Sequence, residues 1–159
     1  MNVTEALPNL PAPIACQIGH VLIASLPAPR GDTPECRADR DTAAIAAVAA
    51  LRPANAFEAL LAADIVGVSA HAMDCLRLAV QPDQAVEETL RIRARAGSLM
   101  RQMQAQLRSL QRIQAERELA DARSHVVVPL PVRAEATRRA GHRSGDVAGR
   151  SRAKLRIVH

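Results

Sequence analysis

Residues 92–113, IRARAGSLMRQMQAQLRSLQRI, decide the fold that we expect for this chain. Apolar or small residues recur in this stretch at alternating intervals of four and three, which is the spacing of the contact face of a coiled-coil helix. One member of the series, Gln106, is polar, and the apolar Met100 lies next to the series on the helix surface. The series is Ile92, Ala96, Leu99, Met103, Gln106, Leu110 and Ile113. The stretch therefore predicts a long helix with an apolar seam, in an all-α protein.

Capping signals predict two long helices. Asp83 can cap the helix that holds the seam, which is expected over residues 84–121. Asn55 and Glu58 have capping-box spacing, in which each side chain binds a free amide of the other's turn, and they predict a helix over residues 56–80. At 1.5 Å per residue the two helices would measure about 58 Å and about 37 Å. The excess length of the first predicts an oligomer.

A shorter helix completes the expected core. The alanine-rich run at residues 42–51 can be capped by Asp39 or Asp41, and Pro53 ends it because the residue before a proline avoids helical backbone. Together with the two longer helices it predicts a helical hairpin or three-helix core over residues 39–122.

The two flanks have compositions that disfavour packed helices. Residues 1–38 contain six of the ten prolines, which predicts an extended or disordered arm. Residues 125–132, HVVVPLPV, favour an edge strand or an extended segment, because Pro129 and Pro131 exclude a central strand. Residues 123–159 are expected to form that extended segment and a disordered, arginine-rich tail.

The apolar residues are mostly small. Apolar residues make up 48% of the chain, but 32 of them are alanine, and Phe57 is the one aromatic residue. The core is therefore expected to be thin. This composition excludes a platform of aromatic side chains that stack on bases, and a sugar site lined with Trp and Tyr.

The formal net charge of +5 belongs to the C-terminal end. Residues 133–159 hold eight basic and two acidic residues, whereas residues 1–132 sum to −1. Because guanidinium groups bind phosphate through paired hydrogen bonds, this tail predicts contact with nucleic acid. A tail that only solubilises the chain is the alternative. The predicted contact residues are Arg138, Arg139, Arg143, Arg150, Arg152, Lys154 and Arg156.

A second basic patch is expected on the long helix. Arg101, Arg108 and Arg112 fall within about 40° of one another on a helical projection, opposite the seam. The lack of aromatic residues argues against reading of bases, so any nucleic-acid binding is expected to be non-specific and weakened by salt. A solvated helix face is again the alternative.

Few residues suggest catalysis or metal binding. Asp64 and His71 share the expected apolar face of the 56–80 helix and could in principle transfer protons. No nucleophile or oxyanion donor accompanies them, so we expect them to pair with polar groups of a neighbouring helix or subunit. Cys16 with His20, and His71 with Cys75, are spaced by four and could offer zinc ligands. Neither pair has the closer spacing of structural zinc modules, so we expect no metal and no cofactor.

The cysteines and the N-terminal sequence predict a cytoplasmic location. Three widely spaced cysteines do not suggest a disulfide framework. The apolar run at residues 14–26 lacks a preceding basic residue, unlike a secretory signal, and is shorter than a membrane span. We expect no membrane partner and no small-molecule substrate.

One segment resembles a known family. Residues Asn55 to Pro82, NAFEALLAADIVGVSAHAMDCLRLAVQP, are similar to the helical segment of an uncharacterised family of small bacterial proteins. The shared pattern is a capped start, a block of apolar residues and alanine, a Met-acid-Cys-Leu-Arg stretch and a Gln-Pro break. The resemblance implies a helical fold and supplies no activity, cofactor or site.

These observations predict a non-enzymatic, self-associating helical protein that contacts nucleic acid non-specifically through its arginines. The alternative is a protein-only scaffold or adaptor that binds partner helices through the apolar faces of the 56–80 and 84–121 helices. Salt-dependent binding of nucleic acid distinguishes the two. The residues expected at the oligomer interface are Ile92, Leu99, Met103, Leu107, Leu110 and Ile113.

Overall fold

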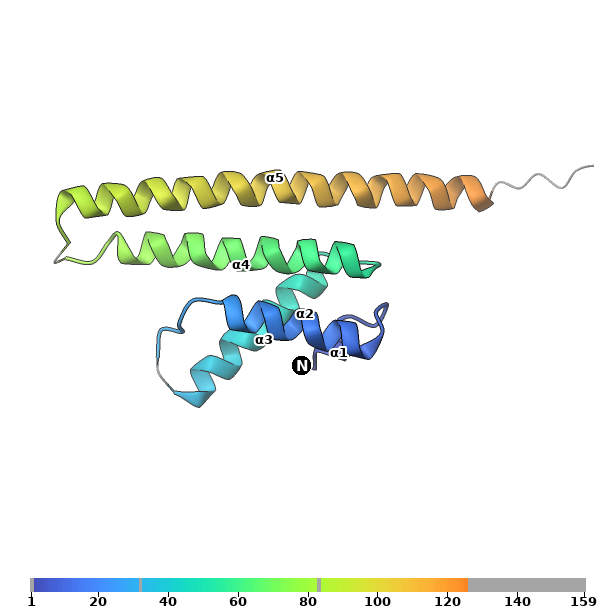
Figure 1. The fold of residues 1–159 in the computed structure, drawn as a ribbon, viewed down its shortest axis with the longest axis horizontal. Coiled ribbons are helices and arrows are strands. Elements are labelled where there is room, and N and C mark those ends of the chain that lie inside the picture. Colours follow the sequence, from blue (N-terminus) through green and yellow to red (C-terminus); the bar gives the residue numbers. More distant parts are fainter. Residues whose placement is uncertain (1, 32, 83, 126–159) are drawn as a thin grey trace, which may run out of the picture. The chain divides into compact units, whose positions relative to one another are not determined.

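Five helices make up the part of the chain that the computed structural model describes, residues 2–31, 33–82 and 84–125 (Figure 1). The prediction of an all-α protein with a long C-terminal helix is confirmed. The predicted extended segment and the arginine-rich tail beyond residue 125 lie outside the described residues. The helices are α1 (Val3–Ala6), α2 (Ala12–Ser25), α3 (Pro34–Ala50), α4 (Ala56–Leu78) and α5 (Val86–His125).

The N-terminal 38 residues are largely helical, so the prediction of an extended or disordered arm there is wrong. Pro11 is the N-cap of α2, and Pro34 is the first residue of α3. Proline is tolerated at the start of a helix because the amide that it lacks would have no partner there. The prolines of this region therefore mark where helices begin.

The start of α3 also differs from the prediction. Its N-cap is Thr33, whose hydroxyl accepts a hydrogen bond from the backbone N–H of Cys36 at 3.2 Å. The predicted caps, Asp39 and Asp41, lie inside the helix. The helix ends before Pro53, as predicted.

α1 contacts α2 at a glycine. A β-carbon at Gly19 would lie 2.7 Å from Cγ2 of Val3, which is closer than carbon atoms approach one another without bonding. Gly19 is buried, and Leu7, which follows α1, is 4% exposed. The short N-terminal helix is thus part of the packed core.

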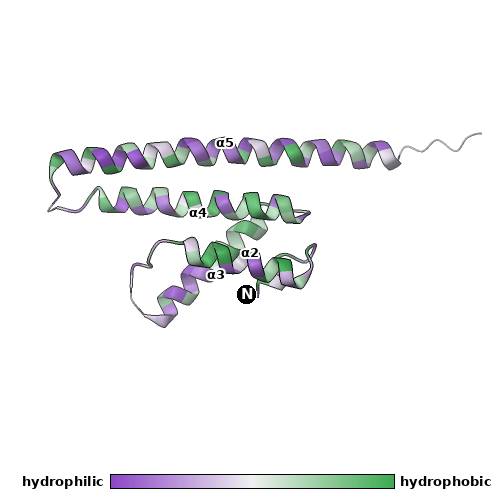
Figure 2. Cartoon of the chain, viewed as in Figure 1, coloured by the Kyte–Doolittle hydropathy of each residue, from purple (hydrophilic) through white to green (hydrophobic). Residues whose placement is uncertain are grey.

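α4 is the central helix. It packs along α5 and also contacts α2 and α3, and it lies between α5 and these helices in Figure 1. Asn55 caps it as predicted, with its side chain accepting a hydrogen bond from the N–H of Glu58 at 2.9 Å. Figure 2 shows that hydrophobic residues are concentrated in α2 and α4, whereas α5 is largely hydrophilic. By length and composition alone α4 could cross a membrane, but the core helix of a soluble protein meets the same criteria.

The core is built largely from alanine. Small side chains let the backbones of neighbouring helices approach closely, so that even one added carbon is felt there. Leu110 and Glu58 are the largest fully buried side chains. The alanines that are at most 1% exposed are Ala15, Ala59, Ala62, Ala72 and Ala96.

α4 and α5 form an antiparallel pair (Figure 1). α5 has 40 residues and α4 has 23, which correspond to about 60 Å and about 35 Å. Among the described helices, α4 is the one that contacts α5. Most of the surface of α5 is therefore uncovered, and this surface carries most of its charge.

Candidate nucleic-acid interface

An arginine-rich, acid-free stretch occupies the middle of α5. Six arginines and no acidic residue occur between Thr89 and Ala115. All six arginines are exposed. Each is therefore available to a ligand in solution unless it is already paired. The six are Arg91, Arg93, Arg95, Arg101, Arg108 and Arg112.

Only the first of these arginines has an acidic partner among the described residues. Arg91 forms an ion pair with Glu87 at 2.6 Å and lies 3.9 Å from Glu88. The other five have no ion pair or side-chain hydrogen bond in the part of the chain that the structure describes. Their charge is uncompensated locally, which favours binding of an anion.

Three of the unpaired arginines lie in one stripe, which we call the arginine face. It consists of Arg101, Arg108 and Arg112. On a helix these residues span about 17 Å along the axis and about 40° around it. The stripe is opposite the seam that packs against α4, so no described helix covers it. A linear array of guanidinium groups on a rigid helix can bind several phosphates of one polyanion.

The predicted tail contacts cannot be placed beside the arginine face. All of them, from Arg138 to Arg156, lie outside the described residues. The tail therefore stays a prediction of the sequence, and the arginine face is the part of the candidate interface that has a defined geometry.

The predicted oligomer seam faces α4 of the same chain over part of its length. Leu110 is 1% exposed, and Met103 and Leu107 pack against the core. The other three predicted interface residues, Ile92, Leu99 and Ile113, are half-buried. Because a second chain would reach only this half-buried part, self-association through the seam stays a prediction.

Glu58 and Arg117 form a buried ion pair that the sequence did not reveal. Glu58 is 0% exposed, and Nη1 of Arg117 lies 2.5 Å from both of its carboxylate oxygens. The carboxylate also accepts hydrogen bonds from the N–H of Ala54 at 2.9 Å and from Nδ2 of Asn55 at 3.0 Å. Two signals were present in the sequence. Glu58 has capping-box spacing from Asn55, although its carboxylate binds the N–H of Ala54 and not that of Asn55, and Arg117 occupies the next seam position after Ile113.

This environment changes the pKa of both partners. Burial raises the pKa of Glu58, but the Ala54 N–H and the Arg117 guanidinium together outweigh burial, so the pKa lies below the ordinary value of a glutamate. The hydrogen bond to Glu58 raises the pKa of Arg117. Both groups are therefore charged at neutral pH, and the pair fixes α5 to the start of α4.

Asp64 and His71 pair with neighbouring helices, as predicted, but both are exposed rather than set on a buried apolar face. Oδ2 of Asp64 accepts a hydrogen bond from Nε2 of Gln106 on α5. Nε2 of His71 lies 2.7 Å from the carbonyl oxygen of Ser25 on α2 and donates to it. The two residues do not contact each other, so the structure gives no proton-transfer pair.

The candidate metal ligands are not brought together. Cys16 and His20 are both exposed on α2, and Cys75 is half-buried on α4. Within residues 2–31, 33–82 and 84–125, no group of three or more His, Cys, Asp or Glu side chains could hold a metal ion.

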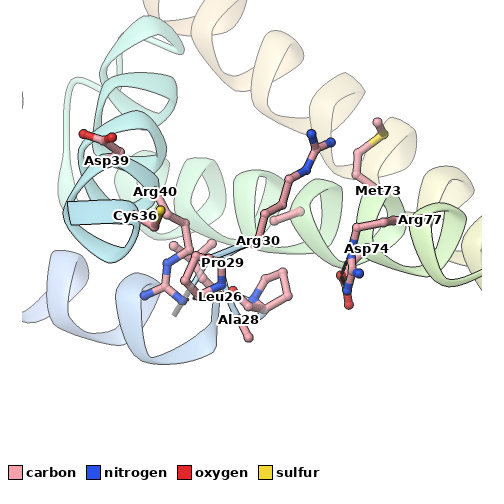
Figure 3. A pocket seen from close by; sticks show the side chains of 13 residues that line it. Leu26, Ala28, Pro29, Arg30, Cys36, Asp39, Arg40, Met73, Asp74 and Arg77 are labelled. Atoms are coloured by element: carbon pink, nitrogen blue, oxygen red, sulfur yellow. Dashed lines mark hydrogen bonds and ion pairs between the residues drawn. The ribbon is translucent and has the colours of Figure 1, made fainter. Parts of the chain in front are cut away.

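A hollow of about 390 Å³ lies between the α2–α3 link and α4 (Figure 3). Figure 3 shows Asp74 and Arg77 on α4, on the other side of the hollow from Cys36 and Arg40 on α3. Arg40 is held by Asp41 at 2.6 Å, and Arg77 is held by Asp74 at 2.6 Å. Two of the three arginines that line the hollow are thus already paired, so the hollow offers an anion less than α5 does.

Comparisons with known proteins identify no function for this chain, so the arginine face of α5 remains the guide to it. No family model, no curated protein and no solved structure matches the chain. The chain is a small all-helical protein, and its role has to be argued from the charge and exposure of its own residues.

Proposed function

We propose that this chain is a non-enzymatic, self-associating helical protein that contacts nucleic acid non-specifically through its arginines. The observation that carries the nucleic-acid part is the arginine face of α5, where three exposed guanidinium groups lie in line with no acidic residue in the surrounding 27-residue stretch. The tail arginines would add to this charge.

The chemistry of the surface favours contact with phosphate over contact with bases. Arginine binds phosphate oxygens through paired hydrogen bonds. Stacking on bases needs aromatic side chains, and Phe57, the one aromatic residue of the chain, lies on α4 and not on α5. Affinity should therefore be similar for duplexes of unrelated sequence and should fall log-linearly with salt.

The test compares two variants that lose the same charge. Arg101→Gln with Arg108→Gln removes two unpaired arginines, whereas Arg77→Gln with Arg91→Gln removes two that are already paired with Asp74 and Glu87. Binding of a labelled duplex is followed by fluorescence anisotropy at about 50 mM salt, where screening is weaker.

The first variant should bind more weakly and should lower the slope of log affinity against log salt by about 1.8, because each lost phosphate contact changes it by about 0.9. The control should keep most of the affinity. Truncation after Val132 removes the tail arginines, and the resulting loss of duplex affinity measures how much the tail contributes to binding. Equal binding by both variants would remove the role of the arginine face, and no binding by the full-length protein would refute the nucleic-acid proposal.

The protein-only scaffold remains the alternative, supported by the large apolar side chains that the structure leaves exposed. The apolar faces of α4 and α5 that such a scaffold would use pack partly on each other, as the burial of Leu110 and Ala96 illustrates. Less of this surface is left for a partner helix than the sequence suggests. If the full-length protein forms oligomers but does not bind nucleic acid, that result would favour this alternative.

We also propose a cytoplasmic location and a kinship with small helical bacterial proteins, on the basis of the segment Asn55 to Pro82. The location is supported by the cysteines, none of which forms a disulfide within the described residues. The segment coincides with α4 and its flanking turns, so the kinship concerns the central helix and adds no activity.

A further inference from the structure

Two unpaired arginines lie on opposite flanks of α5, near its start. Arg93 and Arg95 are exposed and have no ion pair or side-chain hydrogen bond among the described residues. On a helical projection, Arg93 lies about 80° to one side of the arginine face and Arg95 lies about 120° to the other side. The unpaired charge of α5 therefore extends beyond the arginine face to both flanks of the helix.

An uncharged ridge separates these two flanks. It consists of Leu90, Ala94 and Gly97, which follow one another at intervals of four and three and lie within about 60° of one another on the projection. Leu90 is 60% exposed, and Ala94 is also exposed. A β-carbon at Gly97 would lie 3.6 Å from Nη1 of Arg101, so a guanidinium group lies beside the end of the ridge.

We propose that this end of α5 lies in the major groove of B-form duplex DNA, with the ridge towards the floor and with Arg93 and Arg95 bound to phosphates of the two walls. The inference rests on the nucleic-acid part of the proposed function and names its substrate class. An α-helix with its side chains is about 10–12 Å across, and the major groove is about 12 Å wide and about 8.5 Å deep. The half of α5 that faces away from α4 projects about 5–6 Å from the helix axis, so it can enter the groove while α4 stays outside.

The placement of the charges favours duplex DNA over other nucleic acids. Arg93 and Arg95 are about 200° apart across the outer side of α5, so a single strand lying along the arginine face would not reach both. Single strands also gain affinity from stacking on aromatic side chains, and α5 has none. The major groove of duplex RNA is deep and narrow, which excludes a helix. The two walls of a DNA major groove supply phosphates on both sides of α5.

The arginine face continues from the ridge along the same side of α5. Arg108 and Arg112 follow Arg101 by about 10 Å and about 17 Å along the helix axis. A straight helix diverges from a groove that winds around the DNA, so these two arginines would contact the phosphate backbone where α5 leaves the groove. All five unpaired arginines of α5 would then bind phosphates of one duplex.

The first experiment compares three labelled probes of the same sequence and length, namely a DNA duplex, an RNA duplex and a single DNA strand. Binding to the full-length protein is followed by fluorescence anisotropy at about 50 mM salt. The DNA duplex should bind at least about tenfold more tightly than either other probe, because both of these lose phosphate contacts. Equal binding of the RNA duplex or the single strand would overturn the groove and leave the proposed function standing. No binding of any probe would refute the proposed function itself.

The second experiment removes the two wall contacts. Arg93→Gln with Arg95→Gln should weaken binding of the DNA duplex at least about tenfold and lower the slope of log affinity against log salt by about 1.8, because each lost contact changes it by about 0.9. The affinities for the RNA duplex and the single strand should change less than about threefold, because charges without a direct contact are screened.

The matched control is Arg30→Gln with Arg77→Gln, which removes the same charge from residues outside α5. It should leave all three affinities within about threefold of the wild type. Circular dichroism shows whether each variant remains folded. Equal losses for all three probes in the Arg93 and Arg95 variant would overturn the assignment of these residues to the groove walls.

A third variant tests the ridge without a change of charge. Ala94→Phe adds bulk where the helix would already fill the groove, so binding of the DNA duplex should weaken at least about fivefold. Ala120→Phe is the matched control, because Ala120 is an exposed alanine of α5 outside the arginine-rich stretch. If Ala94→Phe binds the DNA duplex as tightly as Ala120→Phe does, the ridge does not enter the groove and the inference is wrong.

Discussion

Replacing Glu58 by glutamine tests what the buried ion pair contributes to stability. The two side chains have nearly the same volume, but glutamine replaces one acceptor oxygen by an NH2 group. That group would face a second donor, either Arg117 or the N–H of Ala54, both of which bind the carboxylate in the native protein. Glu58 is 0% exposed, so water cannot compensate for this loss at the carboxylate itself.

We expect Glu58→Gln to lower the free energy of unfolding by about 2 kcal/mol. Hydrogen bonds to charged groups contribute about 1.5–3 kcal/mol each. We place the expected loss towards the lower end of this range because the Arg117 side chain is 31% exposed, so its guanidinium can form hydrogen bonds to water in the variant. The same change at Glu87 is the matched control. Glu87 pairs with Arg91 at 2.6 Å but is 77% exposed, and exposed pairs contribute little.

The assay is urea unfolding followed by far-ultraviolet circular dichroism, because a chain without Trp or Tyr has little intrinsic fluorescence. With a denaturant slope of about 2 kcal/mol per molar urea, the midpoint of Glu58→Gln should fall by about 1 M. The difference from wild type should also depend on pH. The folded-state pKa of Glu58 is lowered, so its contribution is present above the unfolded value, about 4.3, and is lost as the pH falls through the folded value.

The two glutamate variants must therefore differ at neutral pH and converge in acid. Equal shifts of the unfolding midpoint for Glu58→Gln and Glu87→Gln at pH 7 would refute the assignment of stability to burial of the pair. A stability difference that persists unchanged at low pH would show that the effect comes from the amide and not from the lost charge.

Four further changes have defined expectations in the same unfolding assay. Gly19→Ala should destabilise the folded protein by about 1–3 kcal/mol, because the new carbon would meet Val3 and overpacking forces neighbouring atoms to shift. Gly97→Ala is the control: the nearest atom to its new β-carbon would be 3.6 Å away, so this change should be neutral or stabilising. Leu110→Ala should cost about 2–5 kcal/mol, as for other fully buried leucines; a smaller loss would place Leu110 outside the core. Asn55→Ala should cost about 1 kcal/mol through loss of the cap of α4, and an unchanged midpoint would refute that role.

The helices with regular sequence signals were predictable. The capping pair at Asn55 and Glu58 gave the start of α4, and the 4-3 spacing gave the seam of α5. Pro53 gave the end of α3. These features depend on contacts within a few residues, which a single sequence displays directly.

The N-terminal helices were not predictable from proline content alone. The prediction treated the six prolines as helix breakers, but Pro11 is the N-cap of α2 and Pro34 is the first residue of α3, where proline is tolerated. The distinction depends on whether the residues that follow can bury a face. α2 does so with Ile18 and Leu22, each 3% exposed, and that burial requires the tertiary neighbours.

The partners of the polar residues also depend on tertiary structure. Periodicity indicates that one face of a helix is covered, but it does not identify what covers it. The seam of α5 predicted an oligomer, and the structure shows that α4 of the same chain covers Leu110 and much of this face. Arg117 takes the next position of the 4-3 spacing after Ile113, and it continues the face as the partner of Glu58.

The seam turns α5 towards α4, which directs Arg101, Arg108 and Arg112 away from α4. Self-association through a surface away from these arginines would leave the arginine face of each chain exposed, and a polyanion that reached both would be held with the added effective concentration of a second site. Weak, non-specific contacts from three arginines would gain most from such an arrangement, which gives the proposed self-association a physical reason in a protein whose proposed phosphate-binding surface is short.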